Sequence, residues 1–237
     1  MQLVLLAAGK GSRLPKKYRN YPKCMVHIRN KNILEHNIEF YNKFKFKTII
    51  SGYKSNKLKN FIQKNNFNNI VNEKYKFTNM VYSLFKLRSI KSNHIVVCYS
   101  DIIFDKNIFK NLKKNRSLIL LKKNWLNVWK GRMNYKKILS DAENVTIKKN
   151  KLISIGGKIT KKLPKYQYMG ILKLKYTDFI NLKKFFKKIN NSKINFTNFI
   201  NMSLKHGVID LEVVKTNKFW FEIDTKEDIN FARKELW

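Results

Sequence analysis

Short apolar runs alternate with segments of helical periodicity through the first half of the chain, and this alternation limits the fold more than any other feature. The pattern predicts strands at 2–8, 47–52, 68–72, 94–101 and 117–122, separated by helices at 32–44, 55–64, 78–90 and 105–115. Strands that are separated by helices pair in parallel and are covered by helices on both faces. The sequence therefore predicts a three-layer α/β/α fold of Rossmann-like type with a mostly parallel central sheet.

The second half of the chain has a different pattern. Residues from about 122 to 175 contain short predicted strands, among them a hairpin within 144–157 that turns near Lys149 and Asn150. Two helices, two strands and a closing helix follow, at 176–189, 194–207, 210–215, 219–224 and 225–236. Because no linker or low-complexity segment divides the chain, we expect one domain over 1–237, with a substrate-facing insert at about 122–175.

The chain is strongly basic, since 51 Lys and Arg against 15 Asp and Glu give a formal charge of +36. Such a charge suits a polyanionic partner, either a nucleic acid or an anionic membrane surface. The lysines are scattered over the whole length, however, and Lys, Asn, Ile and Phe are all abundant, as AT-rich codon usage produces. A nucleic-acid-binding protein is therefore kept only as an alternative.

The cysteines and the length of the apolar runs predict the location of the protein. Its two cysteines, Cys24 and Cys98, cannot form a disulfide framework, which favours a reducing cytoplasm. No apolar run reaches the roughly 18 residues of a transmembrane helix, so we expect no membrane partner. The sequence does not indicate an oligomeric state.

A glycine-rich turn directly follows the first predicted strand, in the stretch LVLLAAGKGSRL at 3–14. Gly9 and Gly11 lack a Cβ, so backbone N–H groups there can approach phosphate oxygens, and Lys10 and Arg13 supply positive charge. In parallel sheets ligands gather at the carboxyl ends of the strands, where this loop lies. The spacing is neither that of a Walker A loop nor G-x-G-x-x-G, and a tight turn without a ligand explains it as well.

The few acidic residues carry information through their positions. Asp101 stands where the apolar run at 94–101 stops, and Glu222 and Asp224 lie on one side of an extended segment. Mg²⁺ takes one or two carboxylates together with substrate phosphates. Structural roles also fit these residues: Asp101 as a turn or cap residue, and Asp224 as the N-cap of the last helix, with Glu227 at capping-box distance.

The segment LAAGKGSRL at 6–14, followed by YPKCM at 21–25, resembles the signature of nucleotidyltransferases that activate sugars and small phosphorylated alcohols. The resemblance implies a GT-A-type fold that binds a nucleoside triphosphate and Mg²⁺. Cys24 and Met25 stand where that family often has Pro-Leu, at a structural position.

The same resemblance implies roles for individual residues. The loop would wrap the base and phosphates through Leu6, Ala7, Ala8, Gly9 and Gly11. The catalytic cations would be Lys10, Arg13 and Lys23, which hold the triphosphate and neutralise its charge. The metal ligands would be Asp101 and Asp224, with Glu222 as an alternative or additional ligand.

Three further stretches resemble cytidylyltransferases that act on phosphocholine or 2-aminoethylphosphonate. They are TNMVYSLFKL at 78–87, NWLNVWKGRMNYKKILSDAE at 124–143 and WFEIDTKEDINFA at 220–232. The first implies that Asn79 and Ser83 lie near the nucleotide. The acceptor would meet Trp129, Tyr168 and Trp220 through its cationic group and Arg132 and Lys136 through its phosphate.

Some of these assignments leave alternatives open. Ordinary packing is the alternative role for Trp129, Tyr168 and Trp220. Asp141 and Glu143 also face the acceptor in this interpretation. Their role is open among orienting a catalytic lysine, contacting an amino group and approaching the metal.

Together these features predict a CTP-dependent cytidylyltransferase. CMP would pass to a small phosphate or phosphonate acceptor with release of pyrophosphate, for decoration of a surface polysaccharide or lipid such as a capsule. The acceptor is left open among 2-aminoethylphosphonate, phosphocholine and a phosphorylated amino acid such as glutamine phosphate. A sugar-1-phosphate nucleotidyltransferase is the alternative within the same class.

Overall fold

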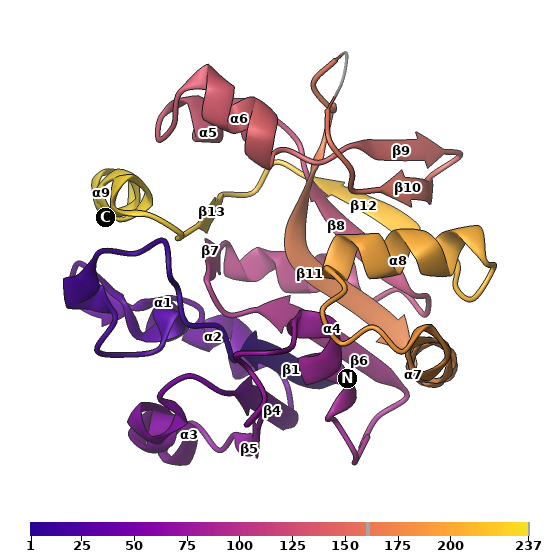
Figure 1. The fold of residues 1–237 in the computed structure, drawn as a ribbon, viewed down its shortest axis with the longest axis horizontal. Helices are drawn as coiled ribbons and strands as arrows, with labels where there is room; N and C mark the ends of the chain where they lie inside the picture. The colour runs from indigo at the N-terminus through magenta and orange to yellow at the C-terminus, as the bar shows by residue number, and fades with distance from the viewer. Residues whose placement is uncertain (160–161, 237) are drawn as a thin grey trace.

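The computed structural model describes residues 1–159 and 162–236, and its centre is a nine-stranded sheet in the order β5-β4-β1-β6-β11-β8-β12-β10-β9 (Figure 1). The strands are β1 (Gln2–Ala7), β4 (Phe46–Ser51), β5 (Asn68–Val71), β6 (His94–Tyr99), β8 (Leu118–Lys122), β9 (Val145–Lys148), β10 (Lys151–Ile155), β11 (Gln167–Lys175) and β12 (Glu212–Thr216). All but β10 and β11 run in one direction. The predicted α/β fold with a mostly parallel central sheet is confirmed.

Two small antiparallel pairs complete the strands: β13 (Trp220–Glu222) with β7 (Ile102–Phe104), and β2 (His27–Ile28) with β3 (Lys31–Asn32). The α-helices are α1 (Ile33–His36), α2 (Ile38–Tyr41), α3 (Lys59–Lys64), α4 (Met80–Phe85), α5 (Trp125–Lys130), α6 (Tyr135–Asp141), α7 (Tyr176–Ile189), α8 (Phe196–Lys205) and α9 (Lys226–Glu235). Short 3₁₀ helices are η1 (Lys16–Tyr18), η2 (Lys23–Met25), η3 (Ser55–Leu58) and η4 (Lys106–Leu112).

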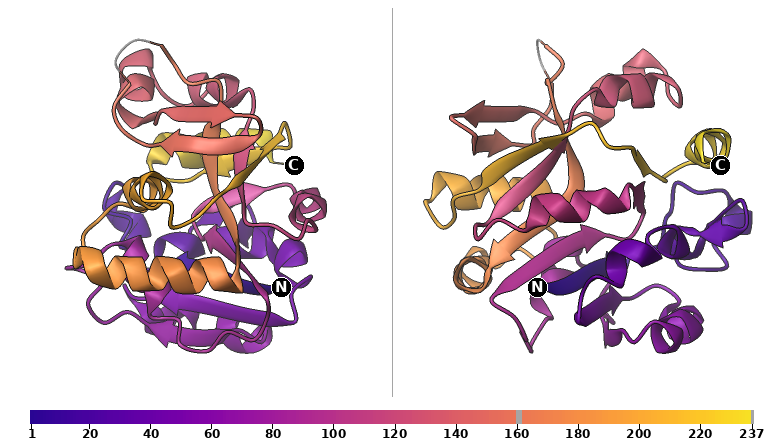
Figure 2. Two further views of the ribbon diagram at one scale, coloured as in Figure 1. Left: turned by 90° about the vertical axis from the view of Figure 1, so that its right-hand side faces the viewer. Right: turned by 180° about the vertical axis from the view of Figure 1, so that it is seen from behind.

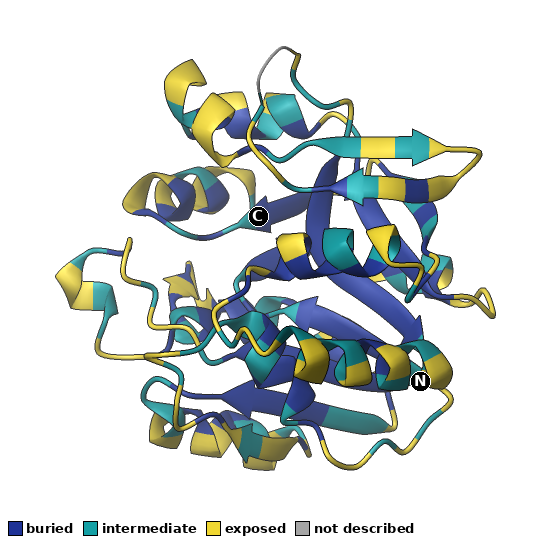
Figure 3. Cartoon of the chain, turned by 45° about the vertical axis from the view of Figure 1, so that its right-hand side comes forward, coloured by how far each residue is buried: buried dark blue, intermediate teal, exposed yellow. Residues whose placement is uncertain are grey.

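The layers follow from the alternation of side chains along the strands. In β1, Leu3 and Leu5 join one hydrophobic core, and Val4 and Leu6 join the core on the opposite face. The first core packs against α1–α3, η4, α5 and α6, and the second against α4, α7 and α8 (Figure 2). Burial on both faces explains why β1 reads as a continuous apolar run (Figure 3).

Two predicted helices take a different form. The helix expected at 32–44 is broken at Asn37 into α1 and α2. The Asn37 amide donates to the carbonyl oxygens of Ile33 (3.1 Å) and Ile102 (2.7 Å) and accepts from the Phe104 N–H (3.2 Å), so it ties the break to β7. The segment expected as a helix at 105–115 forms the 3₁₀ helix η4 instead.

The region at 122–175 is only partly separate from the sheet. The hairpin β9–β10 turns at Lys149 and Asn150, whose φ angles of 45° and 62° fit a two-residue hairpin turn, as predicted. However, β11 is a central strand between β6 and β8. The helices α5 and α6 stand at one end of the sheet, above β13 in Figure 1, and close one side of the site described next.

Candidate active site

The glycine-rich loop follows β1 at the carboxyl edge of the sheet, beside the end of β6. The Ser100 hydroxyl donates to the Leu6 carbonyl oxygen (2.7 Å), and the Tyr53 N–H donates to the Ala8 carbonyl oxygen (3.1 Å). Gly11 has φ of +66°, in the left-handed region that glycine adopts without strain, and a Cβ there would lie 3.1 Å from Lys23 Cβ. The loop therefore packs directly onto Lys23, in agreement with the sequence signature that pairs this loop with a lysine about ten residues further on.

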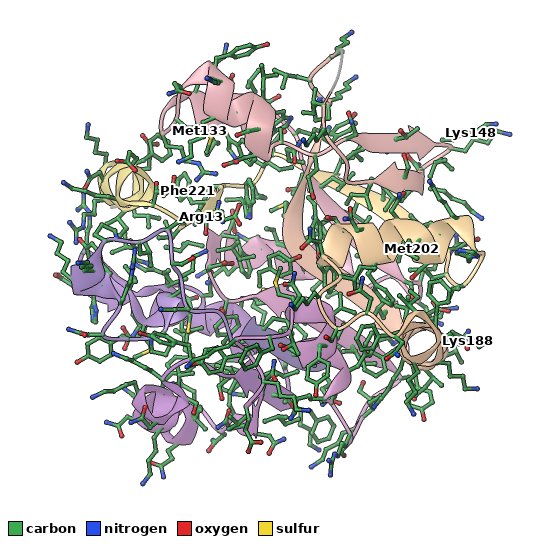
Figure 4. The ribbon with its side chains drawn as sticks, in the orientation of Figure 1. Arg13, Met133, Lys148, Lys188, Met202 and Phe221 are labelled. Atoms are coloured by element: carbon green, nitrogen blue, oxygen red, sulfur yellow. The ribbon has the colours of Figure 1, made fainter. Side chains whose placement is uncertain are left out.

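Two cations from the first 23 residues meet two carboxylates from distant segments. Lys23 Nζ lies 2.7 Å from Asp101 Oδ2 and also bonds to Asp224 Oδ1. Arg13 Nη2 lies 2.6 Å from Asp224 Oδ2. Figure 4 labels Arg13, which reaches toward β13 from the loop after β1. The sheet thus brings together three charged residues, Lys23, Asp101 and Asp224, that are far apart in the sequence.

The charges in this cluster shift one another's pKa values. Burial would lower the pKa of Lys23, but Asp101, Asp224 and Glu222 outweigh it and raise that pKa above its ordinary value. Burial would raise the pKa of Asp224, but Lys23 and Arg13 hold it below its usual range. For Glu222, burial and the charges of Asp224 and Asp101 raise the pKa to about 8. The cluster therefore contains three carboxyl groups, Asp101, Glu222 and Asp224, against the two cations Lys23 and Arg13.

The three acids also fit a divalent cation. One oxygen each of Asp101, Glu222 and Asp224 lies within 4.8 Å of the others. Asp101 Oδ1 is buried and has no hydrogen-bond partner among the residues that the structure describes. An unsatisfied carboxylate oxygen beside two further carboxyl groups is a donor set that suits Mg²⁺. Lys23 supplies positive charge to two of the same carboxyl groups, those of Asp101 and Asp224.

The alternative structural role of Asp224, as the N-cap of the last helix, is wrong. The N-cap of α9 is Thr225, and Asp228 at the third helical position completes the capping box in place of Glu227. The Asp224 side chain instead faces Lys23 and Arg13. Its carboxylate is therefore not committed to the helix.

One cavity beside this cluster contains most of the residues expected near the nucleotide. It is lined by Leu6, Ala7, Ala8, Gly9, Lys23, Cys24, Tyr75, Thr78, Asn79, Met80, Ser83, Ser100 and Asp101. Asn79 is the N-cap of α4, and its amide donates to Asn195 Oδ1 (2.8 Å). Ser83 accepts a hydrogen bond from the buried Asn72 (2.9 Å). Lys10 and Gly11 do not line this cavity; the Lys10 ammonium lies 6.0 Å from the Tyr53 ring centroid.

A second cavity, of about 290 Å³, begins at Arg13, Glu222 and Asp224 and extends to the start of α8. Among the residues expected at the acceptor it contains Trp129, Arg132, Asp141, Glu143, Tyr168 and Trp220. Lys136 does not line it and is exposed, whereas its neighbour Lys137 does line it. Met133, labelled in Figure 4 between α5 and α6, belongs to the same wall.

Two of the residues expected at the acceptor already form contacts within the protein. Arg132 is buried, donates to Asp228 Oδ1 (2.5 Å) and to the Glu222 carbonyl oxygen (3.2 Å), and places its guanidinium carbon 5.1 Å from the Trp129 ring centroid. Trp220 is buried and its indole N–H donates to the Met169 carbonyl oxygen (3.0 Å). Their contacts hold α5, α9 and β13 together around the cavity.

Sequence reasoning missed the contribution of α8 and its preceding turn. Asn195, Phe196 and Thr197 line the acceptor cavity, as do Tyr99 and Gln167. These residues belong to no local motif. The one signal in the sequence for their role was the predicted start of a helix near residue 194, because the fold places the start of this helix at the cavity.

A glycine-rich loop, a lysine and paired acids at the carboxyl edge of such a sheet are the arrangement expected of a nucleotidyltransferase. Residues 3–119 match the MobA-like NTP transferase domain, and this match supports the predicted nucleotidyltransferase activity together with the relatives described next. The match ends before Glu222, Asp224 and most of the residues that line the second cavity, although Arg13, Met80, Tyr99 and Ile102 of that lining lie within it.

Curated relatives resemble the chain over different extents. The CTP:phosphoglutamine cytidylyltransferase of Campylobacter jejuni subsp. jejuni serotype O:2 is 28% identical over 253 residues, 97% of this chain and 98% of that protein. The choline-phosphate cytidylyltransferase of Streptococcus pneumoniae is 30% identical over 132 residues, 54% of this chain and 57% of that protein. The predicted resemblance to small-molecule cytidylyltransferases is confirmed.

Solved structures show the same fold. CTP:phosphocholine cytidylyltransferase from Streptococcus pneumoniae superposes with a TM-score of 0.81 at 22% identity, covering 100% of this chain and 99% of that one. The inositol-1-phosphate CTP transferase from T. maritima superposes with a TM-score of 0.79 at 15% identity, covering 98% and 95%.

Proposed function

We propose that the protein transfers CMP from CTP to a small phosphate or phosphonate acceptor and releases pyrophosphate. The observation that carries this proposal is the junction of the two cavities at one charged cluster. Lys23 and Asp101 line the first cavity, Arg13 and Asp224 line the second, and Lys23 bonds to both aspartates. A triphosphate in one cavity and an acceptor phosphate in the other would therefore meet at these four residues.

The reaction we propose needs no covalent intermediate with the protein. An acceptor oxygen attacks the α-phosphorus of CTP in line, and the bond to the β-phosphate oxygen breaks. The residues of this chain position the two substrates and neutralise the charge that develops on them. Mg²⁺, held by Asp101 and Asp224 with Glu222 as a further ligand, would supply additional positive charge at the phosphates.

Lys23 and Arg13 change partners in this scheme. In the structure both cations are paired with Asp224. With a triphosphate bound, the Lys23 ammonium and the Arg13 guanidinium would turn to phosphate oxygens, which releases the carboxylates for the metal. Lys10, exposed at the tip of the loop, would add charge at the outer phosphates.

The identity of the acceptor class rests on the relatives and on the second cavity. Acids and aromatic rings line that cavity beside Arg13 and Lys137, as suits an acceptor with both a phosphate and a cationic group. We propose 2-aminoethylphosphonate, phosphocholine or a phosphorylated amino acid, activated in the cytoplasm by a single-domain enzyme for a cell-surface polymer. In residues 1–159 and 162–236 no helix is both long and apolar enough to cross a bilayer.

A pyrophosphate-release assay with each of CTP, ATP, GTP and UTP tests this function. The acceptor panel should contain the three proposed acceptors, glutamine phosphate representing the amino acids, and glucose 1-phosphate as a sugar acceptor. We expect magnesium-dependent turnover with CTP and a nitrogen-containing acceptor. Turnover confined to a sugar 1-phosphate would instead favour a sugar nucleotidyltransferase.

A further inference from the structure

Glu143 is held in place by two elements, α8 and β11, at the wall of the acceptor cavity. Its carboxylate Oε1 accepts a hydrogen bond from the Thr197 hydroxyl of α8 (2.6 Å). Its backbone is paired with the buried Gln167 of β11, whose amide donates to the Glu143 carbonyl oxygen (2.9 Å) and accepts from its N–H (3.4 Å). All three residues line the cavity that also contains Arg13 and Asp224. The carboxylate is therefore fixed in position within the space that the acceptor would enter.

The charge of this carboxylate is not balanced within the described part of the chain. No Lys, Arg or His nitrogen of residues 1–159 and 162–236 forms a salt bridge with Glu143. That is notable in a chain of charge +36. Burial raises the pKa of Glu143, which marks an anion that a bound cation would stabilise. A hydroxyl satisfies one oxygen and leaves the other for a ligand.

The aromatic rings of the cavity are less available to a cation than their number suggests. The Trp129 ring already has the Arg132 guanidinium near it, with Trp125 packed edge-on at 5.0 Å. The Tyr168 ring stacks parallel to Phe196 with centroids 6.3 Å apart and meets Tyr99 edge-on at 5.7 Å. A quaternary ammonium group needs open aromatic faces, because it has no N–H to donate. A primary ammonium group donates to a carboxylate in short, charge-assisted hydrogen bonds.

We propose that Glu143, positioned by Thr197 and Gln167, receives a protonated primary amino group of the acceptor and so selects phosphorylated or phosphonylated primary amines over quaternary ammonium compounds. This inference rests on the proposed cytidylyl transfer and narrows its acceptor. The acceptor phosphate would face Arg13 and Asp224, and the amino group would face Glu143, within the same cavity.

Phosphoethanolamine and phosphocholine form a matched pair of probes, because they differ only in three N-methyl groups. With CTP and Mg²⁺, we expect the wild-type kcat/KM to be about 10–100-fold higher for phosphoethanolamine, the range that a hydrogen bond to a charged group provides. Glu143→Gln should abolish this preference by lowering kcat/KM for phosphoethanolamine by a similar factor. The loss should fall mainly on KM, because the amino group is remote from the reacting phosphorus.

Two further variants separate positioning from folding. Thr197→Val keeps the carboxylate but removes its hydroxyl partner, and should lower the preference by only about 3–10-fold. Glu39→Gln makes the same chemical change at an exposed residue outside the cavity and should leave both kcat/KM values unchanged.

The outcomes distinguish this inference from the function on which it rests. Equal or better use of phosphocholine by the wild type, or an unchanged preference in Glu143→Gln, overturns the role of Glu143 and leaves cytidylyl transfer in place. Absence of pyrophosphate release with CTP and every acceptor of the panel removes the proposed function itself.

Discussion

Replacing Lys23 by methionine tests whether the buried ammonium and a divalent cation serve the same carboxylates. The Lys23 side chain is 11% exposed, and its partners Asp101 and Asp224 are 23% and 13% exposed. Removing one partner of a buried ion pair costs about 3–5 kcal/mol, because the other charge is left unbalanced. Here Arg13 remains beside Asp224 and water reaches part of the cluster, so we expect a loss near the lower limit, about 3 kcal/mol.

This loss is large enough to measure by thermal unfolding. For a chain of this length 1 kcal/mol shifts Tm by about 2–4 °C, so Lys23→Met should melt about 6–12 °C below the wild type in the presence of a chelator. Lys106→Met is the matched control. Lys106 and its partner Glu39 are 51% and 66% exposed, and solvent screens such a pair, so this control should leave Tm almost unchanged.

Magnesium should then recover part of the lost stability. A cation that binds only the folded protein adds about 1.4 kcal/mol at ten times its Kd, which corresponds to about 3–6 °C here. In the wild type, Mg²⁺ alone must compete with Lys23 and should raise Tm less. An equal rise in both proteins, or a variant as stable as the wild type in chelator, would refute the idea that the two cations compete for these acids.

Three other perturbations follow from the structure. Asp101→Asn should lower kcat by about 1,000-fold or more, since it removes a proposed ligand of the charge-stabilising Mg²⁺, while circular dichroism shows an unchanged fold; near-normal turnover with Mg²⁺ would contradict the metal assignment. Burial raises the pKa of Glu143, so between the unfolded and folded pKa values the folded state binds a proton that the unfolded chain has lost; the stability that this proton contributes is complete below the unfolded pKa and disappears as pH rises through the folded pKa. The stability of Glu143→Gln against urea, measured relative to the wild type, should therefore be higher at pH 8 than at pH 4, and the opposite trend would refute this. Gly170→Ala places a Cβ 2.9 Å from the Tyr99 ring at a φ of +76° and should lower the free energy of unfolding by about 2 kcal/mol or more. Gly207→Ala, at a φ of +62° in open space, should lower it by about 1 kcal/mol, and equal melting temperatures of the two variants would show that the contact with Tyr99 is unimportant.

The sequence was sufficient for features that a local pattern encodes. Buried strands such as β1 are continuous apolar runs, and the carboxyl end of a parallel strand is a known position for ligands, so the loop after β1 and Asp101 could be placed at one edge. The hairpin at Lys149 and Asn150 is encoded by its turn. The pairing of Asp101 with Asp224, by contrast, was implied only by the resemblance, because no local rule connects segments so far apart.

Other features depend on details that only tertiary contacts determine. Whether Lys136 or Lys137 faces the cavity depends on the rotation of α6, which the Asn134 cap and the packing of Ile138 fix. Thr225 rather than Asp224 caps α9, because Lys23 and Arg13 hold the aspartate. Thr197 reaches Glu143 only through the position of α8. Periodicity gives the existence of a helix but not its rotation against its neighbours.

The bond between Lys23 and Asp224 spans 201 positions of sequence, and this span has a consequence for biosynthesis. A ribosome that adds about 5–20 residues per second needs about 10–40 s to pass from one partner to the other. A nascent chain long enough to contain the whole MobA-like segment at 3–119 has Asp101 beside Lys23 but still lacks Asp224, which pairs with both Lys23 and Arg13. The emerging protein therefore carries more cations than carboxylates at its candidate active site until translation is nearly finished, and a ribosome-stalled fragment ending before Asp224 should be able to build strands but not to bind the proposed magnesium–nucleotide complex.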